Sequence, residues 1–184
     1  AEAAAISAIP LSPTVEQAIE TIPKCRGKVF TTGIGKAGYI AKKAASTFST
    51  TGTPSVFLHP GDAPHGDVGV IAEGDILLAF SNSGRTREVH ETILFCRKLL
   101  VSSVISVVAS KSSPIAEESD VVLEIGQIQE PCPLGMTPTS STAAMMALAD
   151  ALALTVMAER GFSKEDFAVR HHGGYLGKKL REEC

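Results

Sequence analysis

Short runs of apolar residues alternate along the chain with stretches in which apolar residues recur at helical spacing. The runs are short enough to be strands and rich in valine, isoleucine, leucine and phenylalanine; they fall at 28–32, 55–59, 75–80, 102–110 and 120–125. Helical spacing follows at about 37–52, which closes at a glycine, and at about 86–100 and 139–160. Strands this apolar are typical of a parallel sheet covered on both faces. The alternation predicts right-handed crossovers and a doubly wound α/β fold.

Size and composition narrow the possible folds and partners. A chain of 184 residues predicts a single domain over residues 1–184, built as a three-layer α/β fold around a five-stranded parallel sheet. A net charge of −3 and 5% aromatic residues are a poor basis for nucleic-acid binding, so we expect no such partner. The apolar stretch 143–158 contains Asp150 and is shorter than the ~20 residues of a membrane span, which predicts a buried helix and no membrane association.

The N-terminal residues and the cysteines indicate a compartment. The first ten residues lack the basic start and long apolar core of a signal peptide, so we expect none. Four widely spaced cysteines without a C-x-x-C pair fit free thiols in a reducing compartment. Both features favour a cytoplasmic protein.

Small polar and ionisable residues follow every predicted strand except the fourth. They are Gly33 and Lys36 after the first strand, His59 and His65 after the second, Ser81, Ser83, Thr86 and Glu88 after the third, and Glu130, Thr139, Ser140 and Ser141 after the fifth. In doubly wound sheets, ligands bind outside the carboxyl ends of the strands. These loops therefore predict one ligand site along a single edge of the sheet.

Two of these loops, 81–86 and 137–142, have the composition of phosphate sites. Hydroxyls and backbone N–H groups at the start of a helix bind anions, and the helix dipole favours negative charge there. Serine and threonine are also the ordinary N-cap residues, so helix capping explains either loop by itself. Two such loops on the same edge of one sheet favour a ligand.

The stretch "GIGKAG" at 33–38 matches the G-x-G-x-x-G pattern of dinucleotide-binding folds. Such a site also needs an acidic residue about 20 positions further on, at the end of the second strand. Here that strand ends "VFLH", and Asp62 lies beyond it in a loop with two histidines. The P-loop pattern is not matched either. Lys36 instead suits a small charged substrate, beside a phosphate or a developing oxyanion, and we expect no cofactor.

Five segments together resemble the sugar isomerase (SIS) domain family and, within it, the arabinose 5-phosphate isomerases. They are "GIGKAG", "STTGTPSVFLHPGDAPHGD", "SNSGRTREV", "EPCPLGMTPTSSTAAMMALADALAL" and "RGFSKEDFAVRHHGG". The resemblance runs from about residue 14 to 180. It implies a flavodoxin-like SIS fold and the interconversion of D-ribulose 5-phosphate and D-arabinose 5-phosphate, which feeds Kdo synthesis for lipopolysaccharide or capsule. It also implies a cytoplasmic homotetramer that requires no metal.

The resemblance assigns roles to individual residues. The catalytic positions that it carries over are Lys36, Glu88, Glu130 and His171. Those that match substrate contacts are Gly52, Thr53 and His65, while His59 matches a position associated with an inhibitory metal. In this family the segment around His171 reaches a neighbouring subunit, so the resemblance implies active sites shared between copies.

The sequence also departs from the family pattern. Many members continue into a tandem pair of CBS domains that these residues do not include, so we expect no regulation of this chain through such domains. Arg85 and Arg87 replace residues that are commonly small or acidic, and His172 stands where a proline is usual. None of these changes removes a proposed catalytic group, so we expect them to affect substrate preference and rate rather than reaction class.

The residue types suit the implied reaction on chemical grounds alone. Moving a carbonyl between C1 and C2 requires a base, a proton shuttle between oxygens and a cation for the enediolate. Glu88 or Glu130 is the base if burial raises its pKa, Lys36 steadies the enediolate, and His171 opens the sugar ring or moves a proton. Two alternatives stay open: a sensor domain that binds a phosphosugar or nucleotide sugar without turnover, and an isomerase of another phosphosugar.

Overall fold

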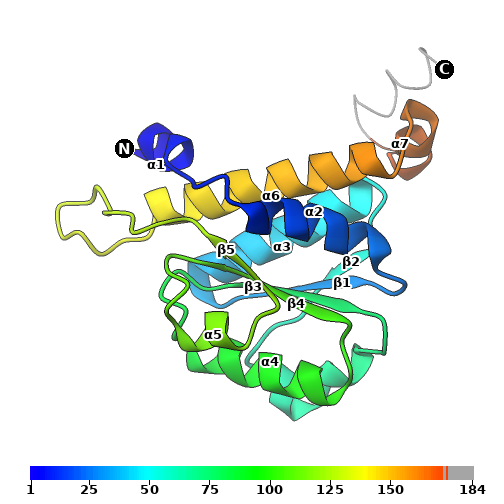
Figure 1. Ribbon diagram of the computed structural model, residues 1–184, viewed down its shortest axis with the longest axis horizontal. Coiled ribbons are helices and arrows are strands. Elements are labelled where there is room, and N and C mark those ends of the chain that lie inside the picture. Colours follow the sequence, from blue (N-terminus) through cyan, green and yellow to red (C-terminus); the bar gives the residue numbers. More distant parts are fainter. Residues whose placement is uncertain (172, 174–184) are drawn as a thin grey trace.

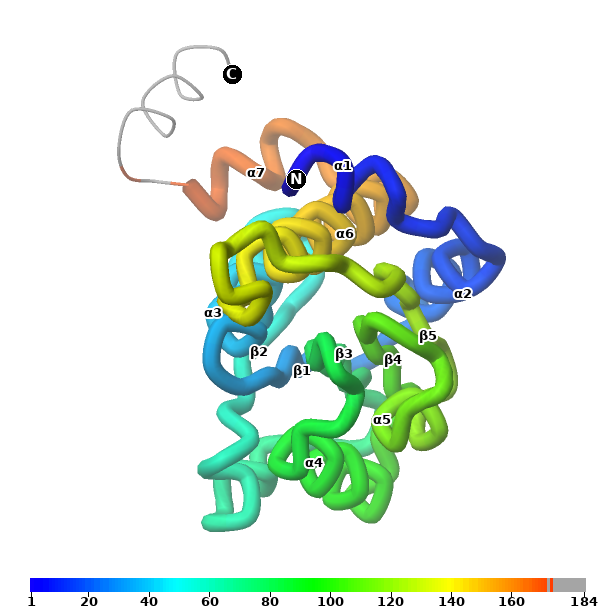
Figure 2. The backbone as a smooth tube through the Cα atoms, turned by 90° about the vertical axis from the view of Figure 1, so that its left-hand side faces the viewer, coloured from blue at the N-terminus to red at the C-terminus, as the bar shows by residue number. Residues whose placement is uncertain are grey.

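The computed structural model describes residues 1–171 and residue 173, and its centre is a five-stranded sheet between two layers of helices (Figure 1, Figure 2). The strands are β1 (Val29–Thr32), β2 (Ser55–Phe57), β3 (Ile76–Phe80), β4 (Ser103–Val108) and β5 (Val121–Glu124). They lie in the order β2-β1-β3-β4-β5, and every neighbouring pair is parallel. This is the flavodoxin-like order, so the three-layer doubly wound α/β fold predicted from sequence is confirmed.

The helices divide between the two faces of the sheet. One face is covered by α2 (Pro13–Thr21), α3 (Gly35–Thr50) and α6 (Ser140–Glu159), and the other by α4 (Arg87–Lys98) and α5 (Pro114–Glu117) (Figure 2). Two short helices, α1 (Glu2–Ser7) and α7 (Lys164–Arg170), lie at opposite ends of α6 (Figure 1). Short 3₁₀ turns complete the described chain: η1 (Ile22–Lys24), η2 (Ala63–His65) and η3 (Asp67–Val70).

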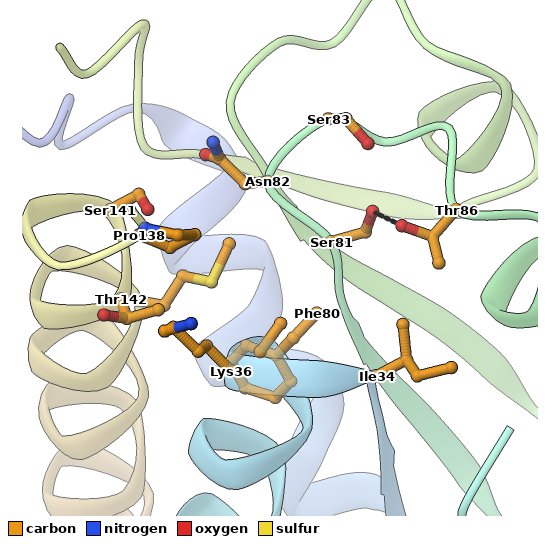
Figure 3. Close-up of a pocket in the computed structure, with 12 residues that line it drawn as sticks. Ile34, Lys36, Phe80, Ser81, Asn82, Ser83, Thr86, Pro138, Ser141 and Thr142 are labelled. Atoms are coloured by element: carbon orange, nitrogen blue, oxygen red, sulfur yellow. Dashed lines mark hydrogen bonds between the residues drawn. The ribbon is translucent and has the colours of Figure 1, made fainter. Parts of the chain in front are cut away.

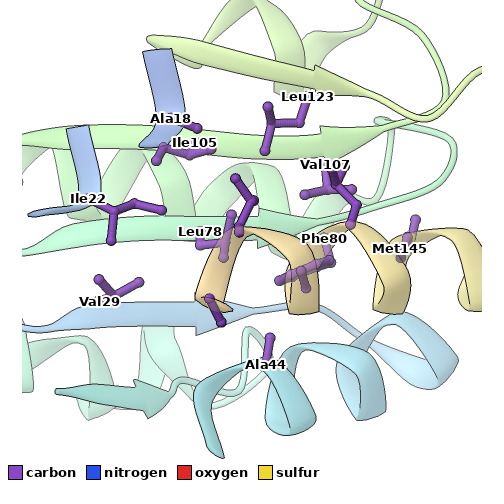
Figure 4. Packing of buried hydrophobic residues seen from close by; sticks show 14 of the residues in the cluster. Ala18, Ile22, Val29, Ala44, Leu78, Phe80, Ile105, Val107, Leu123 and Met145 are labelled. Carbon is purple, nitrogen blue, oxygen red and sulfur yellow. The ribbon is translucent and has the colours of Figure 1, made fainter. Parts of the chain in front are cut away.

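The hydrophobic core lies on both faces of the sheet, because every residue of β1, β3 and β4 is buried. Figure 4 shows the larger cluster, in which Phe80 and Val107 of the sheet pack with Met145 of α6. Among the described residues only α6 is long and apolar enough to cross a membrane. Its Leu148 and Leu152 are buried in this cluster, which is the arrangement expected of a core helix.

The sequence pattern missed helix α2 and placed the start of α3 two residues late. Apolar residues recur in and just after α2 at Val15, Ala18, Ile19 and Ile22, with the spacing of an amphipathic helix, but this stretch is short. Helix α3 begins at Gly35, inside the glycine turn itself. That early start puts the first turn of α3 directly beside the end of β1.

Candidate active site

A cavity of about 310 Å³ opens at the carboxyl edge of the sheet, where the chain leaves β1 and β3 (Figure 3). It is lined by Ile34, Lys36, Ala37, Phe80, Ser81, Asn82, Ser83, Thr86, Pro138, Ser141, Thr142 and Met145. The order of strands reverses between β1 and β3, and open α/β sheets bind ligands at this point. The volume lies at the small end of the range for ligand pockets, which suits a small metabolite.

Lys36 reaches this cavity from the first turn of α3. The helix can start so close to β1 because Gly38 has no side chain: a Cβ at this position would lie 2.7 Å from the carbonyl oxygen of Gly33. The glycines of "GIGKAG" thus serve close backbone packing. Lys36 is exposed and forms no ion pair within the described chain, so its ammonium group is available to an anionic ligand.

The loop after β3 places three of the predicted hydroxyls at the cavity. Ser81 is buried, and its Oγ lies 2.9 Å from Oγ1 of Thr86, the residue that precedes α4 (Figure 3). Ser83 is exposed, and its Oγ accepts a hydrogen bond from the backbone N–H of Arg85 at 3.2 Å. No side-chain cap satisfies the first N–H groups of α4 within the described residues. The loop therefore combines hydroxyls with an uncapped helix start, as an anion site requires.

The start of α6 differs, because the chain supplies its own anion there. Glu130 is only 9% exposed. Its Oε2 accepts hydrogen bonds from the backbone N–H groups of Thr139 and Ser140, both at 2.9 Å, and from Oγ1 of Thr139 at 3.2 Å. Its Oε1 accepts from the backbone N–H of Ser141 at 3.2 Å. A carboxylate in this position satisfies the helix start and complements its dipole.

These contacts decide the acidity of Glu130. Burial favours the neutral acid, but hydrogen bonds from Ser141, Thr139 and Ser140 favour the carboxylate more, and together they lower the pKa to about 2. The sequence made Glu130 a candidate base only if its pKa were raised, and this condition is not met, because the net shift is downward. Of the hydroxyl residues expected at this loop, Ser141 lines the cavity. The backbone N–H groups of 139–141 are hydrogen-bonded to Glu130, so they are not free to bind the anion of a ligand.

Glu88, the other predicted acid, lies in the first turn of α4, two residues after Thr86. Its side chain is exposed at the same edge of the sheet as the cavity, although it is not among the residues that line it. The neighbouring Arg87 pairs with Glu91 at 2.7 Å, so this cation is held along the helix. Neither Arg85 nor Arg87 lines the cavity, and His172 lies outside the described residues.

Three predicted site residues lie at the other end of the molecule. Gly52 and Thr53 follow α3, which runs antiparallel to the strands and ends at their amino edge. His171 follows α7, beyond the far end of α6 (Figure 1). The 20 residues of α6 span about 30 Å, and the cavity lies at its first turn. Lys36 and His171 of one copy therefore cannot contact the same small molecule.

Gly52 has a structural reason to be glycine. Its φ of +92° is unfavourable for other residues, and a Cβ would lie 2.3 Å from Cδ2 of Phe162. The Phe162 ring thereby covers the turn that carries Thr53, whose buried hydroxyl has no hydrogen-bond partner among the described residues.

We expect Gly52→Ala to lower the free energy of unfolding by about 1–2 kcal/mol, because it adds both backbone strain and a clash with Phe162. Urea denaturation measures this change. Gly69→Ala is the matched control, since a Cβ there meets no atom within 4 Å and its φ is not positive. Equal stability of Gly52→Ala and the wild type would contradict the structural role of this glycine.

The two predicted histidines after β2 also lie at the carboxyl edge, outside the main cavity. His59 lines a smaller hollow of about 120 Å³ beside Tyr39 and Lys42, and its Nδ1 lies 3.2 Å from Oδ2 of Asp62. His65 ends η2 and is exposed. Among the described residues, no three His, Cys, Asp or Glu side chains are grouped so that they could hold a metal ion. For the metal contact that the resemblance implies, His59 has Asp62 beside it and no third ligand among the described residues.

Sequence reasoning missed several residues that line the cavity. Asn82 and Thr142 belong to the two predicted phosphate loops, 81–86 and 137–142, and their polar side chains are the signal that could have identified them. Pro138 and Met145 carried no chemical signal, because they shape the cavity only through the way α6 packs.

Comparison with known proteins assigns the chain a family. The SIS domain profile matches residues 22–155. The chain is 46% identical over 156 residues to arabinose 5-phosphate isomerase KdsD of Escherichia coli K12, which covers 85% of this chain and 47% of that protein. The chain thus spans about half the length of the curated relatives it matches.

Solved structures agree with this assignment. A Bacteroides fragilis protein described as a candidate phosphosugar isomerase involved in capsule formation superposes with a TM-score of 0.91 at 45% identity, over 95% of this chain and 93% of that one. The E. coli CFT073 protein c3406, solved in complex with A5P, superposes with a TM-score of 0.87 at 37% identity, over 92% of this chain and 91% of that one.

Proposed function

This chain belongs to the SIS domain family, and from that premise we propose that it is an aldose–ketose isomerase that interconverts D-ribulose 5-phosphate and D-arabinose 5-phosphate. The observation that carries the proposal is the cavity at the β1/β3 switch point, where Lys36 faces the hydroxyl loop before α4. The names of the relatives support the substrate, since the KdsD proteins are named for arabinose 5-phosphate and one solved relative is a complex with A5P. The product would feed Kdo synthesis in the cytoplasm.

The cavity suggests how a pentose phosphate is held. The phosphate binds the loop 81–86 and the uncapped start of α4, where Ser81 and Thr86 supply hydroxyls. The carbon chain then runs toward α3, so that C1 and C2 come near the Lys36 ammonium. A proton leaves the carbon next to the carbonyl, and the resulting enediolate gains stability from this cation. A proton then passes from O1 to O2, and return of a proton to C2 completes the isomerisation.

Of the two acids, Glu88 is the better candidate for the base. Glu130 has a pKa of about 2, lowered against the effect of burial by hydrogen bonds to both of its oxygens, so it is a weak base, and it does not line the cavity. Glu88 accepts no such hydrogen bonds within the described residues and belongs to the helix that would hold the phosphate. We assign proton abstraction to Glu88 and a supporting role to Glu130.

His171 completes the site from a second copy of the chain. Within one copy it lies with Gly52 and Thr53 at the opposite end of the domain from Lys36. If all these residues serve one substrate, two copies must meet with the carboxyl edge of one against the amino edge of the other. The separation within one copy supports active sites shared between copies, as in the homotetramer that the family resemblance implies.

Solvent-deuterium incorporation tests the reaction. We expect ribulose 5-phosphate incubated with the protein in D₂O to yield arabinose 5-phosphate with deuterium at C2, as seen by NMR. Glu88→Gln should slow this conversion by about 10²–10⁴-fold, the usual contribution of a general base. Unchanged sugar with saturable stabilisation of the protein by it would instead indicate a sensor domain. Turnover of a longer ketose phosphate alone would indicate another isomerase.

A further inference from the structure

The side chain of His171 makes two contacts with Phe167. The two rings are stacked, with centroids 3.8 Å apart and planes inclined by 16°. Nδ1 of His171 also lies 3.2 Å from the carbonyl oxygen of Phe167. The backbone of His171 is anchored as well, because its N–H donates to the carbonyl of Ala168 at 3.3 Å. Ring and backbone are therefore both tied to α7.

The contact with the carbonyl determines which ring nitrogen carries the proton. A carbonyl oxygen can only accept, so Nδ1 must be the donor, and in the neutral ring the lone pair is then on Nε2. The stacked Phe167 ring covers one face of the imidazole and opposes its rotation about the side-chain bonds. Nε2, the nitrogen remote from the backbone, is left as the only proton acceptor of the ring.

The helix that supplies these contacts is short but well capped. Ser163 Oγ accepts from the backbone N–H of Asp166 at 3.2 Å, and Oδ2 of Asp166 accepts from the backbone N–H of Ser163 at 3.0 Å. A helix of seven residues is marginal alone, so this capping box contributes to its order. Phe167 is the fourth residue of the helix, one turn before His171, and the i, i+4 spacing brings the two rings together.

We propose that Phe167 is a positioning residue that fixes His171 as the Nδ1–H tautomer and directs Nε2 toward the substrate of the adjoining copy. The catalytic part rests on the proposed isomerase function; the tautomer does not. In an aldose–ketose isomerase, Nε2 would accept a proton from one hydroxyl and return it to the neighbouring oxygen. A ring free to flip would spend part of its time with the donor nitrogen outward, which lowers the rate without changing substrate binding.

The ring nitrogens of ¹⁵N-histidine-labelled protein report the tautomer directly. Spectra are recorded well above the ordinary histidine pKa of about 6.5, and the His171 signals are assigned by their loss in His171→Gln. We expect a protonated Nδ1 and an unprotonated Nε2 in the wild type, mixed tautomers in Phe167→Leu, and wild-type signals in Phe167→Tyr, which keeps the stacked ring. A protonated Nε2 in the wild type, or an unchanged tautomer in folded Phe167→Leu, would overturn the proposal.

Kinetics separate this proposal from the proposed function. With ribulose 5-phosphate, Phe167→Leu should lower kcat about tenfold with KM changed less than about twofold, and Phe167→Tyr should retain most of the wild-type kcat. If the tautomers behave as expected but no variant, nor the wild type, isomerises the sugar, the positioning of His171 stands and the isomerase assignment fails. If the wild type isomerises and Phe167→Leu shows normal kcat, positioning by Phe167 is refuted instead.

Discussion

A mixture of two inactive variants, Lys36→Ala and His171→Ala, is expected to recover about a quarter of the wild-type isomerase activity. The cavity with Lys36 and the turn with His171 lie at opposite ends of α6, about 30 Å apart in one copy, so each site would need both copies. In a random mixture, half of the cavities carry Lys36 and half of the partners carry His171, which leaves about one site in four intact.

The experiment requires subunits that have exchanged. The variants are mixed, partly unfolded together and refolded, and native mass spectrometry verifies that mixed oligomers have formed before activity is measured. A mixture of Lys36→Ala with the double variant Lys36→Ala/His171→Ala is the control, since no combination of its subunits supplies a complete site. Mixed oligomers that remain as inactive as the control would show that the two residues do not serve a common site.

The fold and one part of the candidate site could be predicted from the sequence, because both depend on local patterns. Buried parallel strands are mostly apolar, so β1, β3 and β4 could be located from their composition. Loops at the carboxyl ends of such strands must lie on one edge of the sheet, which predicts that Lys36 and Ser81 lie together, and both line the same cavity. Helix α2 was not predicted, because its apolar positions occupy little more than two turns.

The separation of the candidate residues into two groups could not be predicted from local pattern. Nothing around Gly52 or His171 shows that the turn after α3 and the end of α7 lie far from Lys36; that separation follows from the length and direction of α3 and α6. The low pKa of Glu130 could not be predicted from local pattern either. Its acidity depends on N–H groups of 139–141, nine to eleven positions further along the chain, and burial alone would have changed its pKa in the opposite direction.

Glu130→Gln is expected to lower the free energy of unfolding by about 3 kcal/mol at pH 7, because a neutral amide turns one of its own donors toward the N–H groups that start α6. For a domain of this size, that corresponds to a fall in Tm of roughly 6 to 12 °C. Urea denaturation of both proteins measures the change. Glu73→Gln, the same substitution at an exposed turn residue, is the matched control and should change stability by less than about 0.5 kcal/mol.

The pH dependence of that difference distinguishes a structural anion from a catalytic base. Glu130 has its pKa lowered from 4.5 to about 2 in the folded protein, against the effect of burial, by hydrogen bonds from Ser141, Thr139 and Ser140. The unfolded chain therefore takes up this proton first as the pH falls. The stabilisation is fully present above about pH 4.5 and is lost toward pH 2, so the stabilities of the wild type and Glu130→Gln should converge in that interval.

A catalytic base would give the opposite result: a variant as stable as the wild type at every pH, with kcat reduced at least a hundredfold. Because the carboxylate of Glu130 is already committed to the start of α6, we expect the loss of stability, and any loss of activity should follow from displacement of Ser141 and Pro138 at the cavity wall.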